Sequence, residues 1–273
     1  MTRSFHQLSC KNHRLFATLD SGQEKIGLLI VSGGNEIRSG AHAGMSKLAH
    51  SLSIQDFPVF RFDRRGVGDS SGDNLEFLSS EQDIAAAVLK FRSLCPNLEL
   101  IVAFGNCDAA TALALYGPSN GIDGLILANP WVIDSTQNET TEMTVPNAAA
   151  IRSRYWDRIK NPKSFADLLT GKINILKLIK GLKQAAKKQE NGDIALQLRN
   201  ALVATDIPTH ILVASKDTTA LAFMSAWKSN DYKELQNRSN IRLLELDSAS
   251  HSFADTHSKK WLNDQISDFL RSR

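Results

Sequence analysis

Residues 101–112 read Ile-Val-Ala-Phe-Gly-Asn-Cys-Asp-Ala-Ala-Thr-Ala, an apolar run that passes through a polar turn into an alanine-rich helical pattern. This order predicts a strand, a sharp turn and a helix, which is the layout of a nucleophile elbow, Gly-x-Ser-x-Gly, with Cys107 in place of serine. The strained turn requires small residues two positions before and after the nucleophile, and Gly105 and Ala109 meet this requirement. It also places the thiol at a helix N-terminus, where partial positive charge favours a thiolate.

The alternative for Cys107 is a buried cysteine that acts as a small apolar side chain. The chain has three cysteines without a Cys-x-x-Cys pair, so neither a disulfide framework nor a zinc cluster is indicated. Residues 1–7 lack the apolar core of a signal peptide, and no apolar run approaches the roughly 20 residues of a membrane-spanning helix. We therefore expect a reducing, cytoplasmic location, which suits a thiol nucleophile.

The composition is that of a globular protein, with 273 residues of which 42% are hydrophobic and 22% charged. A net charge of +3 does not call for a nucleic-acid partner. The charge is uneven, because residues 151–200 hold 12 Lys and Arg against 4 Asp and Glu. This basic stretch is either a solvated helical face or a surface that attracts an anionic substrate or a membrane surface.

Continuous apolar runs alternate with helical patterns, which predicts an α/β fold with a mostly parallel, doubly wound sheet covered on both faces. Short alternating segments at 5–9 and 14–19 predict an antiparallel N-terminal hairpin. Residues 132–205 lack a strand pattern and are expected to form a helical cap inserted into a single core domain, 1–131 and 206–273. The expected strands of the core are 27–31, 58–62, 98–104, 124–128, 210–214 and 241–246, and its expected helices are 41–53, 79–95, 108–117, 219–229 and 258–271.

Ligands of open α/β sheets bind at the carboxyl ends of the strands, so the polar residues that follow strands are the candidates for chemistry. Three of them, in chain order, are Cys107, Asp217 and His251, the order nucleophile, acid and histidine. An imidazole can take the thiol proton and later return it to a leaving group, while a carboxylate holds the imidazole tautomer. These residues are therefore our candidates for a catalytic triad.

A tetrahedral intermediate also needs backbone N–H donors for its oxyanion, each worth about 3 kcal/mol of barrier. One candidate is Asp108, the residue after the nucleophile, and the other is the glycine-rich loop at 33–35, with Gly34 and Asn35 as donors. No cofactor or metal is indicated, since the glycines form neither a P-loop nor a dinucleotide fingerprint and metal-ligand spacing is lacking.

Each residue also has a structural alternative. Asp217 could serve as the N-cap of the next helix, and His251 could be a surface residue at a strand end. Asp134, just past the strand at 124–128, is the alternative acid, because some folds of this type place the carboxylate there. We favour a catalytic site because these residue types stand together, in the right order, at the ends of strands.

Five motifs along the chain share a pattern: Val31-Ser32-Gly33-Gly34, Arg61-Phe62-Asp63-x-Arg65-Gly66-x-Gly68-Asp69-Ser70, Gly105-x-Cys107-Asp108-Ala109-Ala110, Leu127-Ala128-Asn129-Pro130-Trp131 and His251-Ser252-Phe253. Together they resemble the α/β-hydrolase superfamily, and more narrowly the exosortase A system-associated hydrolase 1 family, from about residue 20 to the end. The resemblance implies a bacterial cytoplasmic hydrolase encoded beside exopolysaccharide and protein-sorting machinery, with Cys107 as nucleophile, Asp217 as acid and His251 as base.

The resemblance also draws attention to Arg38 and His42 as substrate contacts, although His42 could equally cap or pack the following helix. Asn106 and Trp131 are further candidate contacts beside the elbow. Asn35 stands where the family pattern has proline, and it brings an N–H that proline lacks.

We expect hydrolysis of an ester or thioester, with a small-molecule or acylated substrate of anionic character, through an acyl-thioester at Cys107. Two alternatives remain open. The same triad could transfer the acyl group to a sugar or protein hydroxyl, or the scaffold could be a non-catalytic binding module.

Overall fold

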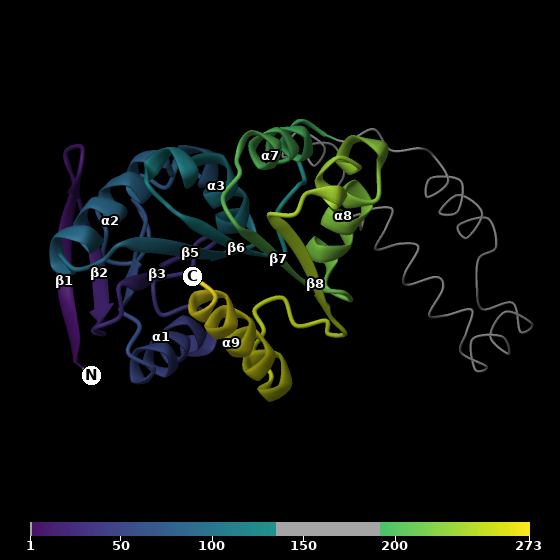
Figure 1. Cartoon of the computed structure of the whole chain (residues 1–273). Helices are drawn as coiled ribbons and strands as arrows, with labels where there is room; N and C mark the ends of the chain where they lie inside the picture. Colours follow the sequence, from purple (N-terminus) through teal and green to yellow (C-terminus); the bar gives the residue numbers. More distant parts are fainter. Residues whose placement is uncertain (1, 135–191) are drawn as a thin grey trace, which may run out of the picture.

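The computed structural model describes residues 2–134 and 192–273. In this part of the chain, eight strands form one sheet in the order β1-β2-β4-β3-β5-β6-β7-β8 (Figure 1). The strands from β4 to β8 pair in parallel, and β1 and β2 form an antiparallel hairpin that pairs with β4. The strands are β1 (Arg3–Cys10), β2 (His13–Asp20), β3 (Ile26–Val31), β4 (Val59–Phe62), β5 (Leu100–Asn106), β6 (Gly124–Ala128), β7 (Thr209–Ala214) and β8 (Ile241–Leu246).

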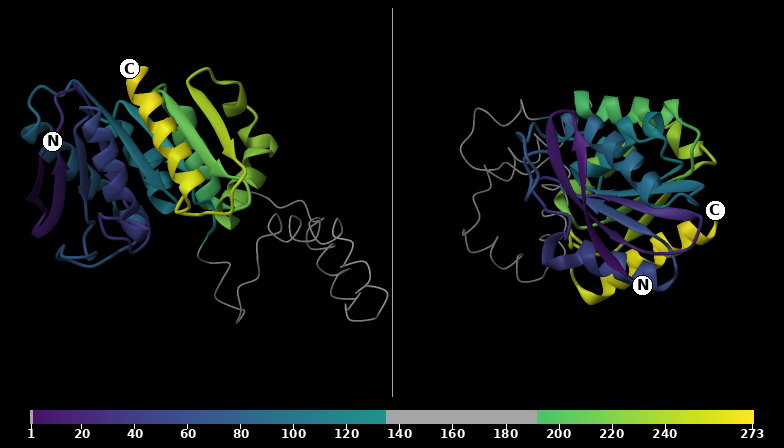
Figure 2. Two further views of the ribbon diagram at one scale, coloured as in Figure 1. Left: turned by 90° about the horizontal axis from the view of Figure 1, so that it is seen from below. Right: turned by 90° about the vertical axis from the view of Figure 1, so that its left-hand side faces the viewer.

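Helices cover both faces of this sheet (Figures 1 and 2). On one face lie α2 (Glu81–Leu94), α3 (Asp108–Tyr116), α7 (Asp193–Ala204) and α8 (Thr218–Trp227). On the other face lie α1 (Gly44–Ile54) and α9 (Thr256–Arg271). The predicted mostly parallel sheet with an N-terminal hairpin is thus confirmed.

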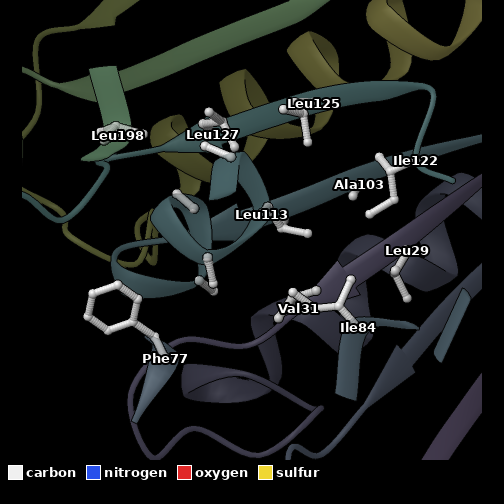
Figure 3. Packing of buried hydrophobic residues seen from close by; sticks show 14 of the residues in the cluster. Leu29, Val31, Phe77, Ile84, Ala103, Leu113, Ile122, Leu125, Leu127 and Leu198 are labelled. Atoms are coloured by element: carbon white, nitrogen blue, oxygen red, sulfur yellow. The ribbon is translucent and has the colours of Figure 1, made fainter. Parts of the chain in front are cut away.

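The core reflects the sequence pattern, because strands covered on both faces need apolar residues at every position. All five residues of β6 are buried. Leu125 and Leu127 face the same cluster as Leu113 of α3 (Figure 3). Ile126 faces the opposite cluster, which includes Phe269 of α9. This central packing fixes β5, β6 and β7 relative to one another, and the site is built at their carboxyl ends.

Helix α7 belongs to the core, although the expected insertion, 132–205, includes it. Its residues Leu198 and Leu202 are fully buried in the same cluster as α3. As part of the expected cap, residues 193–204 were expected to be helical; they form a helix whose apolar face covers the sheet. The remainder of the expected cap, 135–191, lies outside the described residues, and so does most of the basic stretch.

No helix in the described ranges is both long and apolar enough to cross a membrane.

Candidate active site

The turn between β5 and α3 has the geometry expected of a nucleophile elbow. Cys107 has φ 62° and ψ −127°, a left-handed conformation that costs free energy for a residue with a Cβ. The elbow is closely packed, since a Cβ on Gly105 would lie 2.8 Å from the Ala109 carbonyl oxygen. The Cys107 N–H donates to the Ala128 carbonyl oxygen at 2.9 Å, which ties the turn to the end of β6.

Three side chains that are distant in the sequence meet at this edge of the sheet. The His251 ring lies on the loop between β8 and α9, with its Nδ1 3.0 Å from Asp217 Oδ2. The Cys107 thiol lies close enough to the same ring to raise its pKa. Asp217 is buried, with only 6% of its side chain exposed, and its Oδ2 also accepts the N–H of Ala220 at 3.0 Å. Asp217 is therefore both the N-cap of α8 and the partner of the imidazole.

These contacts change the proton affinity of the ring. The pKa of His251 is raised from 6.5 to about 10, first by the hydrogen bond with Asp217 and then by the neighbouring Cys107 thiol, against the opposing effect of burial. The protonated ring is therefore favoured at neutral pH. An imidazolium beside a thiol stabilises the thiolate.

The carboxylate of Asp134, the alternative acid, contacts the first turn of α7. Its carboxylate accepts the N–H groups of Asp193 at 3.0 Å and Ile194 at 2.9 Å, at the first turn of α7. Negative charge at a helix N-terminus is stabilising, so this contact gives Asp134 a structural role. Of the two candidate acids, the structure brings Asp217 to the imidazole.

The three candidate oxyanion donors have different surroundings: Asp108 lies in the first turn of α3, Gly34 lies beside a carboxylate, and Asn35 lies on the surface. The Asp108 N–H lies in the first turn of α3, where helix geometry leaves N–H groups without an intrahelical acceptor. The Gly34 N–H, by contrast, donates to the Asp108 carboxylate at 2.7 Å. Asn35 is exposed, and its side-chain oxygen accepts from Asn74 at 2.6 Å. The glycine loop does reach the elbow, because a Cβ on Gly33 would lie 3.6 Å from the Cys107 Cβ.

Arg64 supports this loop and was not among the predicted site residues. Its side chain is 4% exposed and donates to the Gly34 carbonyl oxygen at 2.6 Å and to the Ser80 hydroxyl at 3.0 Å. The same guanidinium lies 3.4 Å from the Asp108 carboxylate. Asp108 thus holds the backbone N–H of Gly34, and Arg64 holds its carbonyl oxygen. The signal in the sequence was the position of Arg64 two residues after the end of β4.

Asn106, a predicted substrate contact, instead holds the histidine loop. Its Nδ2 donates to the His251 carbonyl oxygen at 3.1 Å. Asn129, fully buried directly after β6, donates to the same oxygen at 3.1 Å and to Asn106 Oδ1 at 3.2 Å. Its own Oδ1 accepts the Ala214 N–H at 2.8 Å, at the end of β7. Asn129 was quoted in a family motif but not assigned a role, although its place after a strand could have singled it out.

The other predicted substrate contacts have different surroundings. Arg38 forms an ion pair with the buried Asp63 and donates to the Thr18 hydroxyl at 3.1 Å, so its guanidinium is held within the scaffold. His42 is exposed in a 3-10 turn, and its carbonyl oxygen accepts from Lys47 at 3.3 Å. Trp131 is half-buried beside the elbow, where its backbone N–H donates to the Cys107 carbonyl oxygen at 3.2 Å.

Solved structures with this architecture span nearly the whole chain. An esterase of Pyrococcus furiosus, Pf2001, superimposes with a TM-score of 0.65 at 15% identity, over 99% of this chain and 92% of the esterase. The chain has the α/β-hydrolase fold. Est1E of Butyrivibrio proteoclasticus, solved with ferulic acid, matches with a TM-score of 0.63 at 15% identity over 98% of both chains. A proline iminopeptidase of Mycobacterium smegmatis matches this fold with a TM-score of 0.56 at 13% identity, also over 98% of both chains.

Comparisons at the level of sequence gave no match, either to a family model or to a curated protein. The narrower resemblance to the exosortase-associated family therefore stays a prediction from the motifs. Within the described residues, no group of three or more His, Cys, Asp and Glu side chains is placed to hold a metal ion.

Proposed function

We propose that the protein is a hydrolase that cleaves an ester or thioester through Cys107, His251 and Asp217. The observation that supports this most directly is the His251 ring, which has the Asp217 carboxylate 3.0 Å from Nδ1 and the Cys107 thiol near enough to raise the pKa of the ring. The α/β-hydrolase fold is consistent with it, since the structural neighbours include enzymes called esterases.

The reaction would run in two steps. The Cys107 thiolate attacks the carbonyl carbon, the His251 imidazolium gives its proton to the departing alcohol or thiol, and an acyl-thioester forms. His251, now neutral, takes a proton from water, whose oxygen attacks the thioester and releases the carboxylic acid and Cys107. The backbone N–H of Asp108 stabilises the oxyanion of each tetrahedral intermediate.

The leaving group limits the substrate class. Alkoxide and thiolate leaving groups compete with the cysteine sulfur in the tetrahedral adduct better than an amine does, so we propose esters and thioesters rather than amides. We further propose, from the basic stretch at 151–200, that the acyl substrate is anionic. The link to exopolysaccharide and protein-sorting machinery and the cytoplasmic location are proposed from the sequence motifs alone.

The first test compares variants of the triad on p-nitrophenyl esters and acyl-thioesters. We expect Cys107→Ala to abolish turnover and His251→Ala to remove most of it. Asp217→Asn should lower kcat about 10⁴-fold, as loss of the orienting carboxylate does in other triads. Cys95→Ala is the matched control and should retain wild-type rates, because Cys95 lies outside this site.

The second test distinguishes the hydrolase from an acyltransferase and from a non-catalytic binding module. Iodoacetamide should alkylate Cys107 faster than Cys95, whose pKa is raised by burial. Equal alkylation rates together with no turnover of any short-chain ester would support a binding module instead. Trapping of the acyl group by added sugar hydroxyls, in preference to water, would identify an acyltransferase. Wild-type activity in Cys107→Ala would refute the mechanism.

A further inference from the structure

A cavity lies between α1 and α9, on the face of the sheet opposite to α3. Its volume is about 250 Å³. This is just below the roughly 300–1,000 Å³ of drug-sized ligand sites, so its occupant would be small. The cavity lies next to the loop that carries His251, because Ser252 and Phe253 form part of its wall.

The floor of this cavity is apolar. Met45 and Leu48 of α1 face Leu262 of α9 and Phe253 of the loop, and all four side chains are buried. Apolar side chains around a hollow favour an apolar ligand group, because filling it removes hydrocarbon surface from water.

The rim of the cavity is positively charged. Lys47, Lys259 and Lys260 line it, and no acidic side chain is among the described residues in its wall. Lys260 is paired with Asp264 at 2.6 Å, so Lys47 and Lys259 provide most of the uncompensated charge. An apolar floor with a cationic rim is complementary to a ligand with a hydrocarbon part and an anionic end.

We propose that this cavity binds a short-chain carboxylate as a free anion, with its hydrocarbon chain on the apolar floor and its carboxylate at Lys47 and Lys259. The site is separate from Cys107 and does not depend on the proposed reaction.

The ligand test uses isothermal titration calorimetry of the full chain with octanoate, octan-1-ol and acetate. We expect octanoate to bind most tightly, octan-1-ol less tightly because it lacks the charge, and acetate less tightly because it lacks the hydrocarbon chain. No binding of octanoate at millimolar concentration would overturn the proposal.

The site test uses two variants that leave the fold intact. Lys47→Gln combined with Lys259→Gln should raise the Kd for octanoate about tenfold and leave that for octan-1-ol unchanged. Lys228→Gln, on the other face of the sheet, is the matched control and should have no effect.

Gly44→Leu fills the cavity, because Gly44 lines it and a Cβ at this position would have no heavy atom within 4 Å. Its melting temperature should stay at or above that of the wild type while binding is lost. Unchanged affinity in the folded Gly44→Leu protein would place the ligand elsewhere, for instance at the catalytic site, and would refute the assignment. If Gly44→Leu fails to fold, the double variant Lys47→Gln, Lys259→Gln tests the assignment by itself. An unchanged Kd for octanoate in that variant would then refute it.

Discussion

The side-chain amide of Asn129 donates to the backbone carbonyl oxygen of His251 at 3.1 Å, across 122 positions of sequence. The same side chain accepts the Ala214 N–H, three residues before Asp217, and donates to Asn106, next to Cys107. One buried amide therefore connects the backbone segments that carry all three proposed catalytic residues.

We predict that Asn129→Asp lowers kcat/KM about 100-fold, or about 2.7 kcal/mol. The aspartate keeps an acceptor for Ala214, but it turns the donor toward His251 and Asn106 into an acceptor that repels their oxygens. Steady-state kinetics on the ester identified for the wild type provide the measurement. Asn120→Asp, on the 3-10 turn after α3, is the control and should leave kcat/KM unchanged. An active Asn129→Asp enzyme would show that this amide does not position the histidine.

A second prediction concerns Asp108, whose carboxylate holds the Gly34 N–H at 2.7 Å and lies beside Arg64. Asp108→Asn keeps an oxygen acceptor and should cost about 1 kcal/mol of unfolding free energy. Asp108→Ala also leaves the buried Arg64 without this carboxylate and should cost about 3 kcal/mol. Chemical denaturation measures both, and hydrogen exchange at Gly34 should accelerate in Asp108→Ala only. Equal exchange rates in the two variants would contradict the role of the carboxylate.

The third prediction compares two glycines. Gly105→Ala should destabilise the protein by about 2 kcal/mol, because its methyl group would lie 2.8 Å from the Ala109 backbone in the elbow. Gly44→Ala should instead stabilise it by about 0.5 kcal/mol, because the helical site is open and alanine favours a helix. Thermal unfolding of the two variants tests the contrast. A stable Gly105→Ala protein would mean that the elbow packs less closely than the structure shows.

The fourth prediction follows from the raised pKa of His251. Between pH 6.5 and about 10 the folded protein holds a proton on His251 that the unfolded chain releases. The stabilisation from the His251–Asp217 pair is therefore complete below pH 6.5 and is lost as the pH rises through about 10. The stability difference between wild type and His251→Gln should shrink over this range, and NMR should show the ring titrating near the upper end. A ring that titrates near 6.5 would contradict the hydrogen-bonded arrangement.

Local sequence patterns were sufficient for the fold. The apolar runs at 27–31, 124–128 and 241–246 correspond to β3, β6 and β8, because strands buried on both faces show continuous hydrophobicity. The same logic placed Cys107, Asp217 and His251 after strands, and the carboxyl ends of parallel strands share one edge of the sheet. Their catalytic roles stay predictions.

Only the tertiary structure decided which candidate residue contacts which partner. Asp134 and Asp217 both follow strands, yet Asp134 caps α7 and Asp217 contacts His251. Likewise, Asn106 lies in the elbow sequence but donates to a carbonyl 145 residues away. Periodicity depends on near neighbours in the chain, so it determines which face or edge a residue occupies. Hydrogen bonds depend on distances of a few tenths of an ångström between loops that meet only after folding, and no local pattern encodes those distances.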